Sequence, residues 1–165
     1  MRLDLAELAD SLAEVFCLAR FDLPLCDIDT ELLPAPHRRP RSLPPGTQAV
    51  YAFIVGECCL KVGKAGPKTQ PRFTSQHYGV KAPSTLAKSI LNDRSRVLGS
   101  VLADHRGEVQ SLDIDSIGNW LEKSTSRVHI FIPATAADCA LALAEAFSQC
   151  RLRPVYEGKG SQNAG

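Results

Sequence analysis

Residues 49–67 read AVYAFIVGECCLKVGKAGP and carry the clearest indication of the fold. Residues 49–55 are apolar, and most of them are the β-branched and aromatic types that favour strands. Gly-Glu at 56–57 interrupts the run, which resumes over 58–62, so the pattern predicts a β-hairpin. Residues 63–67 are rich in glycine and end in proline, which indicates that the second strand ends before them.

Further elements are expected on the C-terminal side of this hairpin. Pro71 suits the first turn of a short helix over 71–78, and Ser84 can cap a helix that runs through Leu91. The remaining expected elements are helices around 97–105, 114–123 and 135–151 and a third strand at 127–132. Their order predicts an α/β (α+β) domain with a small, three-stranded, largely antiparallel sheet flanked by helices.

The N-terminal side of the hairpin has a different pattern. Apolar residues recur every three or four positions over 3–19, which predicts an amphipathic helix. From 21 to 45, repeated prolines forbid a helix and favour a linker or a wrapping arm, which contains a basic segment at 37–41. We therefore expect an N-terminal helix and proline-rich arm at 1–45, a main domain at 46–157 and a flexible tail at 158–165.

The composition is that of a globular protein. Of the 165 residues, 44% are hydrophobic and 22% are charged, which excludes a fibrous or disordered chain. No apolar stretch approaches the roughly 20 residues that cross a bilayer, and the N-terminus lacks the pattern of a secretory signal, so we expect no membrane association and a cytoplasmic location. The six cysteines show no paired CxxC spacing, and we expect them to be structural, with no zinc site.

The net charge of +1 conceals a strong asymmetry along the chain. Residues 1–36 hold two basic and eight acidic residues, whereas residues 37–97 hold eleven basic and two acidic ones, a net charge of +9. A basic block of this size is the electrostatic footprint of a protein that binds a polyanion such as nucleic acid. On charge alone, a solvated face neutralised by the acidic N-terminal segment explains the block equally well.

Several short motifs occur in an order that resembles one nuclease family. In chain order, the motifs are Val50-Tyr51, Lys61-Val62-Gly63-Lys64-Ala65, Arg72, His77, Glu145 and Pro154-Val155-Tyr156. Taken together, they resemble the GIY-YIG nuclease superfamily, both the nuclease module of the bacterial excision-repair enzyme and compact stand-alone members. The resemblance covers residues 46–157 and implies a GIY-YIG-like domain there, with DNA as its partner.

The resemblance also implies a role for each matched side chain in phosphodiester hydrolysis. Tyr51 would take the proton from the attacking water, which needs nearby positive charge because a phenol is only about one part in a thousand ionised at neutral pH. Arg72 would pair with two phosphoryl oxygens, and His77 would donate or relay a proton. Glu145 would hold one Mg²⁺ or Mn²⁺ beside the leaving oxygen. These roles require the phenol, the guanidinium and the acid to meet in one solvent-open hollow.

Three positions depart from the usual family pattern. Ala49 stands where the first motif has glycine, and Lys61 stands where the second motif has tyrosine. We expect Lys61, together with Lys64, to add the positive charge that Tyr51 needs. Glu157 replaces the asparagine of the last motif, which either supplies a further metal ligand or changes the site.

Each of these residues also has an ordinary structural interpretation. Tyr51 alone is typical of a core aromatic, and Arg72 and His77 are typical of a surface. Glu145 could belong to a solvated stripe of its helix, which it would share with Asp138.

Three functions are therefore compatible with the sequence. The first is a metal-dependent DNA endonuclease that binds phosphates through basic side chains, namely Arg38, Arg39, Arg41, Lys68, Lys81 and Lys88. The second is a catalytically impaired module of the same fold that binds nucleic acid without cleaving it. The third is an interaction protein whose acidic N-terminal helix associates with a partner protein or with a second copy.

Overall fold

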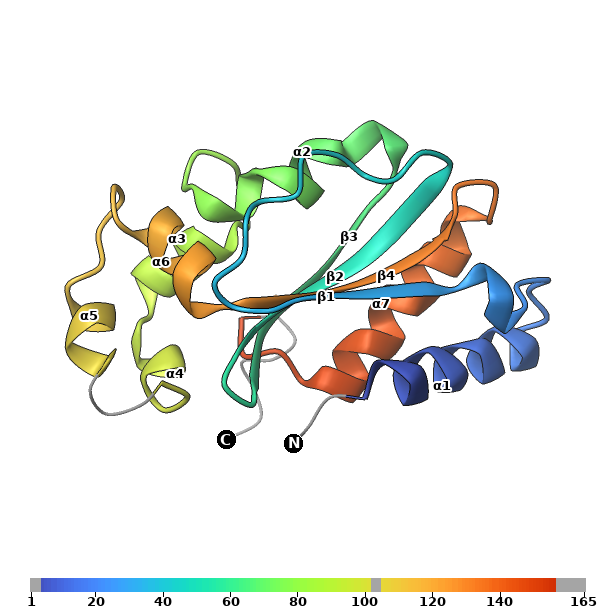
Figure 1. The fold of residues 1–165 in the computed structure, drawn as a ribbon, viewed down its shortest axis with the longest axis horizontal. Helices are drawn as coiled ribbons and strands as arrows, with labels where there is room; N and C mark the ends of the chain where they lie inside the picture. The colour runs from blue at the N-terminus through green and yellow to red at the C-terminus, as the bar shows by residue number, and fades with distance from the viewer. Residues whose placement is uncertain (1–3, 102–104, 157–165) are drawn as a thin grey trace.

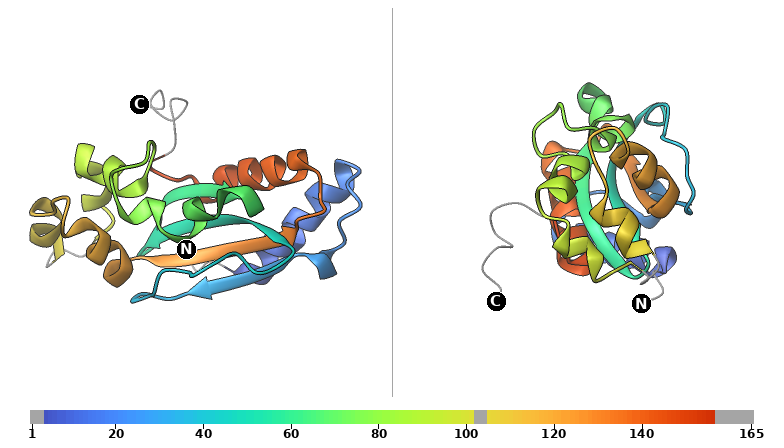
Figure 2. Two further views of the ribbon diagram at one scale, coloured as in Figure 1. Left: turned by 90° about the horizontal axis from the view of Figure 1, so that it is seen from above. Right: turned by 90° about the vertical axis from the view of Figure 1, so that its left-hand side faces the viewer.

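The computed structural model describes residues 4–101 and 105–156, which form a mixed α+β fold around a four-stranded antiparallel sheet (Figure 1). In the order in which they lie side by side, the strands are β1 (Asp29–Leu33), β4 (Ser126–Pro133), β2 (Thr47–Val55) and β3 (Cys58–Ala65). β4 and β2 are central, whereas β1 and β3 are edge strands. Helices cover both faces of the sheet, as the views in Figures 1 and 2 show.

The predicted hairpin is confirmed, and its first strand is central to the sheet. Because both faces of β2 are covered, its residues 49–55 form a continuous apolar run rather than an alternating one. A β-bulge between Phe53 and Ile54 shifts its register with β3. The expectation that the second strand ends before Gly63 is wrong, because β3 continues to Ala65 and pairs Gly63 with Tyr51.

The prediction of three strands is also wrong, because Asp29–Leu33 form a fourth. β1 pairs with β4 along its whole length, with Glu31 opposite His129. It has a neighbour on one side only, and most of its residues are exposed, so it lacks the alternation that marks a half-buried strand. Pro34 follows β1 directly, so these five residues lie in a segment that has the composition of a linker, and the sequence gives no sign of the strand.

The helices α1 (Leu5–Leu18) and α7 (Asp138–Leu152) cover one face of the sheet (Figure 1). Both confirm sequence predictions to within a few residues. Asp4 caps α1 by accepting hydrogen bonds from two backbone N–H groups of the first turn. Leu8, Leu12 and Phe16 recur every four residues along α1 and are buried against the sheet.

The other face is covered by shorter segments. They are α2 (Gln70–Thr74), the 3₁₀ turn η3 (Gln76–Tyr78), α3 (Leu86–Asn92), α4 (Ser95–Leu98), α5 (Arg106–Gln110) and α6 (Ile117–Ser124). The helices α3 to α6 gather at one end of the molecule (Figure 2). Two further 3₁₀ turns, η1 (Leu25–Asp27) and η2 (Pro67–Thr69), precede β1 and α2.

Three helix predictions differ from the structure in detail. The helix expected over 71–78 is divided into α2 and η3, because Ser75 leaves helical geometry at φ −132°. Thr85 rather than Ser84 caps α3, since the Thr85 side chain accepts a hydrogen bond from a first-turn N–H at 3.2 Å. The helix expected around 97–105 begins earlier, as α4, and residues 102–104 lie outside the described residues.

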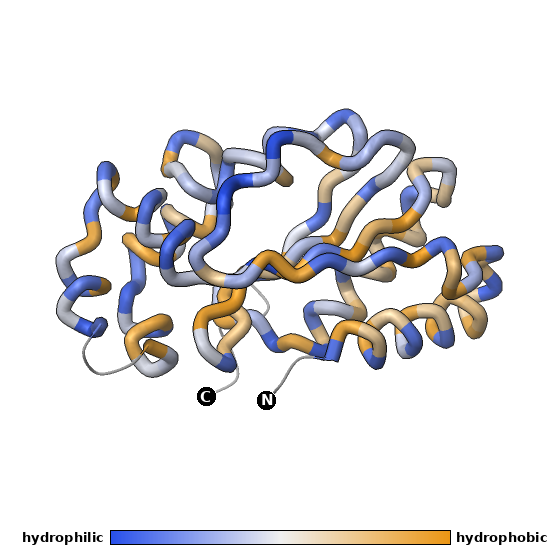
Figure 3. The backbone as a smooth tube through the Cα atoms, in the orientation of Figure 1, coloured by the Kyte–Doolittle hydropathy of each residue, from blue (hydrophilic) through white to orange (hydrophobic). Residues whose placement is uncertain are grey.

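Residues 34–46 connect β1 to β2 and form a strap that passes over the α2 side of the molecule, hydrophilic along its middle (Figure 3). The backbone N–H of His37 donates to the carbonyl of Glu122 at 2.8 Å, and Leu43 is buried in the core. Of the two sequence interpretations, a linker or a wrapping arm, the second describes this strap.

None of the helices in residues 4–101 and 105–156 has the length and hydropathy to span a membrane. The six cysteines are free thiols, with Cys59 buried and Cys58 half-buried in β3. The exposed thiols are Cys17, Cys26, Cys139 and Cys150. Glu157 and the tail predicted at 158–165 lie outside the described residues.

Candidate active site

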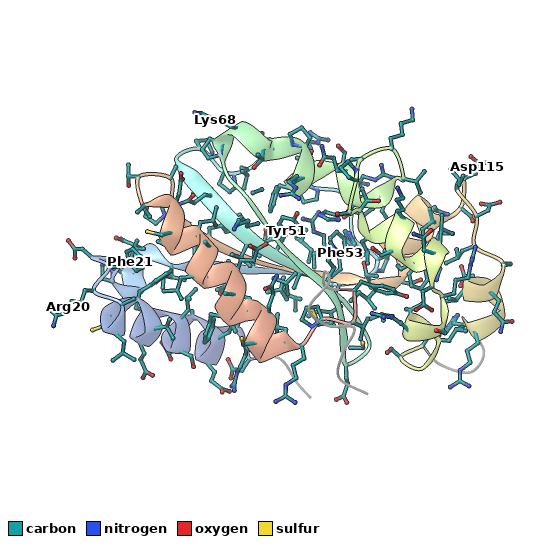
Figure 4. All side chains as sticks on the ribbon, turned by 180° about the vertical axis from the view of Figure 1, so that it is seen from behind. Arg20, Phe21, Tyr51, Phe53, Lys68 and Asp115 are labelled. Atoms are coloured by element: carbon teal, nitrogen blue, oxygen red, sulfur yellow. The ribbon has the colours of Figure 1, made fainter. Side chains whose placement is uncertain are left out.

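Tyr51 lies near the centre of the molecule, on the face of the sheet that α2 and η3 cover (Figure 4). Its partners on the neighbouring strands are Gly63 of β3 and His129 of β4. A Cβ atom at Gly63 would lie 2.7 Å from the Tyr51 hydroxyl oxygen, so only glycine leaves room for the phenol. Tyr51 exposes 2% of its surface. The second motif therefore contributes a glycine that seats the tyrosine of the first.

His77 holds the Tyr51 hydroxyl from η3. The Nε2 atom of His77 lies 2.7 Å from Tyr51 Oη, and the backbone N–H of Leu86 donates to His77 Nδ1 at 3.2 Å. Because Nδ1 accepts, a neutral imidazole carries its proton on Nε2 and donates it to the tyrosine oxygen. Burial, reinforced by nearby Lys61, Arg127 and Arg72, lowers the pKa of His77 to about 3. His77 is therefore a neutral donor to Tyr51.

Lys61, the residue that replaces the second tyrosine of the family, points to the same face as Tyr51. Its strand partner is Phe53, and its Nζ donates to the carbonyl of Tyr156 at 3.2 Å. The backbone N–H groups of Val155 and Tyr156 in turn donate to the carbonyls of Cys59 and Leu60. The last motif thus lies along the outer edge of β3.

Lys64 and Glu145 form an ion pair on the opposite face. Lys64 stands beside Val50, whose face α7 covers, and its Nζ lies 2.8 Å from a carboxylate oxygen of Glu145 on α7. The Lys64 side chain is 35% exposed and the Glu145 side chain 23% exposed. The acid is therefore open to water but lies on the opposite face of the sheet from Tyr51. The expectation that Lys64 adds positive charge beside Tyr51 is wrong for the same reason, whereas Lys61 lies on the Tyr51 face.

A comparison with family models, curated proteins and solved structures finds no match to this chain. The assignment of a function therefore depends on the residues and on their geometry.

A hollow of about 430 Å³ opens at the end of β3, beside the N-terminus of α7. Its lining includes three cationic side chains, Lys64, Lys68 and Arg72, together with Asp138. Tyr51 and Glu145 do not line it. The hollow therefore joins the predicted guanidinium to two ammonium groups, while the phenol and the acid flank β3 on opposite faces. The expectation that phenol, guanidinium and acid meet in one solvent-open hollow is wrong, because Tyr51 and Glu145 face opposite sides of the sheet and Tyr51 is buried.

The remaining basic residues predicted to bind nucleic acid lie on the strap and around α3. Arg38, Arg41, Lys81 and Lys88 are exposed. Arg39 is already engaged, because its Nε donates to Glu122 at 2.6 Å and its guanidinium lies 4.6 Å from the Tyr78 ring centroid. Figure 4 shows Lys68 at the periphery, far from the central Tyr51. The acidic α1 packs on the other side of the sheet, and its association with a partner stays a prediction.

Sequence reasoning missed two functional candidates on β4, Arg127 and His129, both fully buried. His129 Nδ1 lies 2.8 Å from a carboxylate oxygen of Glu31, and its Nε2 has no hydrogen-bond partner among the described residues. Burial, together with Arg127 and His37, lowers the pKa of His129 to about 2. A signal for both exists in the sequence, because Arg and His alternate with Val and Ile in a strand whose two faces are covered.

The strap contributes a third buried histidine, which completes a hydrogen-bonded chain. Arg127 donates to the Tyr78 oxygen at 3.1 Å, and this oxygen lies 2.7 Å from Nε2 of His37, whose Nδ1 lies 2.6 Å from the carbonyl of Thr125. Since a carbonyl only accepts, His37 Nδ1 carries the proton and Tyr78 donates to Nε2. Burial lowers the pKa of His37. The chain locks the strap against η3, next to His77.

Proposed function

We propose that this chain is a metal-dependent endonuclease that hydrolyses DNA phosphodiester bonds at the end of β3. One observation carries the proposal: two consecutive residues contact both key groups, since Gly63 leaves room for the Tyr51 hydroxyl and Lys64 pairs with Glu145. The end of β3 thus carries Gly63 beside Tyr51 on one face and Lys64 beside Glu145 on the other. Arg72 in the adjoining hollow adds a cation suited to a phosphate.

The side chains supply several parts of a hydrolytic reaction. The attacking water loses a proton as its oxygen bonds to phosphorus, and the leaving oxygen gains a proton from solvent as its bond to phosphorus breaks. Tyr51 would take the first proton, and the Nε2–H of His77 would stabilise the tyrosine oxygen before it does so. Arg72 would bind the non-bridging oxygens, and Lys68 would bind a neighbouring phosphate of the strand.

Glu145 is the residue that would hold Mg²⁺ or Mn²⁺. Within residues 4–101 and 105–156, no group of three or more His, Cys, Asp or Glu side chains is arranged to hold an ion. A single carboxylate still fits Mg²⁺, which retains water ligands and binds one or two carboxylates together with substrate phosphates. When bound, the ion would neutralise charge on the phosphoryl oxygens. Lys64 would have to release Glu145 first.

A second function, nucleic-acid binding without cleavage, is favoured by two observations. Lys64 already neutralises Glu145 at 2.8 Å, and Tyr51 exposes only 2% of its surface. A module of this kind would keep the exposed cations and would not turn over substrate. Salt-dependent DNA binding with no cleavage in either Mg²⁺ or Mn²⁺ would favour this function over the first.

The test is a cleavage assay with the full chain over labelled duplex, nicked, branched and single-stranded DNA and over RNA, in Mg²⁺, Mn²⁺ or EDTA. We expect cleavage that EDTA abolishes and that Glu145→Gln reduces at least about 100-fold. Glu14→Gln, which removes an exposed acid from α1, is the matched control. Equal rates for Glu145→Gln and the wild type would show that the assigned role of the acid is wrong.

A further inference from the structure

Arg127 is a buried guanidinium enclosed by aromatic rings. Its side chain on β4 has no exposed surface. Its Cζ atom lies 4.7–5.9 Å from the centroids of four rings, those of Tyr51, Phe53, Phe73 and Tyr78. Distances of this size favour attraction between a cation and the faces of the rings. The rings therefore hold a positive charge in the core, next to Tyr51.

Among the described residues, no carboxylate neutralises this charge directly. Arg127 donates to the Tyr78 oxygen at 3.1 Å and to the carbonyl of Phe73 at 2.9 Å, and its Nε has no partner there. None of the ion pairs within residues 4–101 and 105–156 includes Arg127. A buried charge without a counter-ion is expensive in stability. Its presence is therefore better explained by its effect on neighbouring groups than by stability.

The neighbouring groups are those that the proposed reaction uses. Arg127 lies 5.4 Å from the Tyr51 ring centroid, and Tyr51 is in turn hydrogen-bonded to His77. The guanidinium also helps to lower the pKa of His77, of His129 and of His37. A fixed cation at this place discourages protonation of the histidines and stabilises negative charge on a phenol oxygen.

We propose that Arg127 is a positioning residue: its guanidinium, packed against the Tyr51 ring, stabilises the Tyr51 oxygen when that oxygen is ionised, while the Nε2–H of His77 donates to the same oxygen. Only one part of this proposal rests on the proposed function, namely that the ionised Tyr51 takes a proton from water. Titratable and charged groups face Tyr51 from every element packed around it: Lys61 of β3, Arg72 of α2, His77 of η3, and Arg127 and His129 of β4. Glu31 of β1 lies behind His129.

The direct test is the ionisation of Tyr51, followed by tyrosinate absorbance in the full chain without substrate. The chain has three tyrosines, so the difference between each protein and its own Tyr51→Phe variant isolates Tyr51. We expect Arg127→Met to lower the ionised fraction of Tyr51 at a given pH at least about tenfold, and Arg127→Lys, which keeps the charge, to lower it less. Circular dichroism at each pH verifies the fold. An ionised fraction in folded Arg127→Met within about twofold of the wild type would overturn the proposal.

A second measurement keeps the proposal testable if Arg127→Met does not fold. Nitrogen-15 spectra of the histidine rings in the wild-type chain should show His77 neutral, with its proton on Nε2, from pH 7 to pH 5. A His77 that is protonated in this range, or that carries its proton on Nδ1, would overturn the proposal.

Neither measurement uses DNA, so the two proposals can fail separately. A chain that shows the Arg127 effect but cuts no substrate contradicts the proposed function alone. A chain that cuts DNA while Tyr51 ionises equally in the wild type and in Arg127→Met contradicts the role of Arg127 alone.

Discussion

The two faces of the sheet are built from different kinds of side chain. The face under α1 and α7 is filled mainly by apolar residues of the helices and strands, such as Leu12, Val62 and Ile130, and Ser148 of α7 is a small polar exception. The other face also buries polar and charged groups, namely His37, Tyr51, His77, Tyr78, Arg127 and His129. Apolar packing stabilises without directing protons, whereas buried polar groups are retained with defined donors and acceptors. The apolar core of the first face should therefore govern stability, and the buried donors and acceptors of the second should set the ionisation of Tyr51, while the half-buried Glu145 lies on the first face.

The largest expected effect is on the apolar face. Leu12 has no exposed surface in the core beneath α1, so Leu12→Ala should lower the free energy of unfolding by about 3 kcal/mol. Leu18→Ala on the same helix is the control, because Leu18 is 84% exposed and its loss should cost less than about 0.5 kcal/mol. Denaturant unfolding gives both values. If Leu12→Ala also abolished DNA binding while still folded, the division between the faces would be wrong.

A smaller loss of stability, with a larger effect on chemistry, is expected at Gly63. A Cβ there would lie 2.7 Å from the Tyr51 hydroxyl, so Gly63→Ala must displace the phenol, at about 1–3 kcal/mol, and should abolish cleavage. Gly66→Ala is the matched control, because nothing lies within 4 Å of a Cβ at that position. Thermal unfolding and cleavage rates measure the two effects. Cleavage by Gly63→Ala at the wild-type rate would show that the position of the Tyr51 hydroxyl beside Gly63 does not affect catalysis.

The buried histidines should make stability fall on the acid side. An unfolded histidine takes up a proton near pH 6.5, whereas folded His77 resists protonation down to about pH 3 and His129 down to about pH 2. The unfolded state therefore binds more protons below pH 6.5, and the free energy of unfolding falls as the pH drops, by up to about 1.4 kcal/mol per pH unit for each histidine.

His77→Gln tests this dependence. Between pH 6 and pH 4, it should reduce the slope of the free energy of unfolding against pH by about 1.4 kcal/mol per pH unit, the contribution of one proton. Urea unfolding at each pH measures this slope. His105→Gln is the control for the loss of an exposed imidazole. A slope in His77→Gln equal to that of the wild type would mean that His77 is not held neutral by the fold.

The smallest expected effect concerns the strap. Arg38 and Arg41 are exposed, whereas Arg39 is bound to Glu122 at 2.6 Å. Replacing Arg38 or Arg41 with Gln should reduce the slope of log affinity for DNA against log salt by about 1 each, and replacing Arg39 should reduce it less. Filter binding over a range of salt concentrations measures these slopes. An equal or larger change for Arg39 would show that its pairing with Glu122 opens when DNA binds.

Much of the apolar framework could be predicted from the sequence, and its limits have physical causes. The hairpin, α1 and α7 follow from long apolar patterns with a clear period. β1 escaped prediction because an edge strand with one neighbour exposes most of its side chains, so Asp29–Leu33 show no buried alternation. The hydrophobic pattern of a strand also cannot show how many helices cover each face of the sheet.

The sequence likewise indicates only some parts of the candidate site. The order of the motifs along the chain indicates Tyr51, His77 and Glu145, whereas the pairing of Tyr51 with Gly63 escaped prediction because the second strand was expected to end before Gly63. The opposite facing of Lys64 and Gly63 depends on the strand continuing through residues whose composition suggests a turn. Arg127 escaped because an arginine in a strand usually faces water. Only the layer of α2, η3 and α6 above it makes that position internal.

The most direct test of the account is the rate at which Tyr51→Phe cleaves DNA in Mg²⁺ or Mn²⁺, measured beside the wild type and Tyr156→Phe. Tyr156→Phe removes a phenol whose hydroxyl donates to the carbonyl of Asp93 at 2.6 Å, away from Tyr51. We expect the wild type and Tyr156→Phe to cleave at similar rates and Tyr51→Phe to lose at least about 100-fold. Cleavage by folded Tyr51→Phe at the wild-type rate would contradict the account.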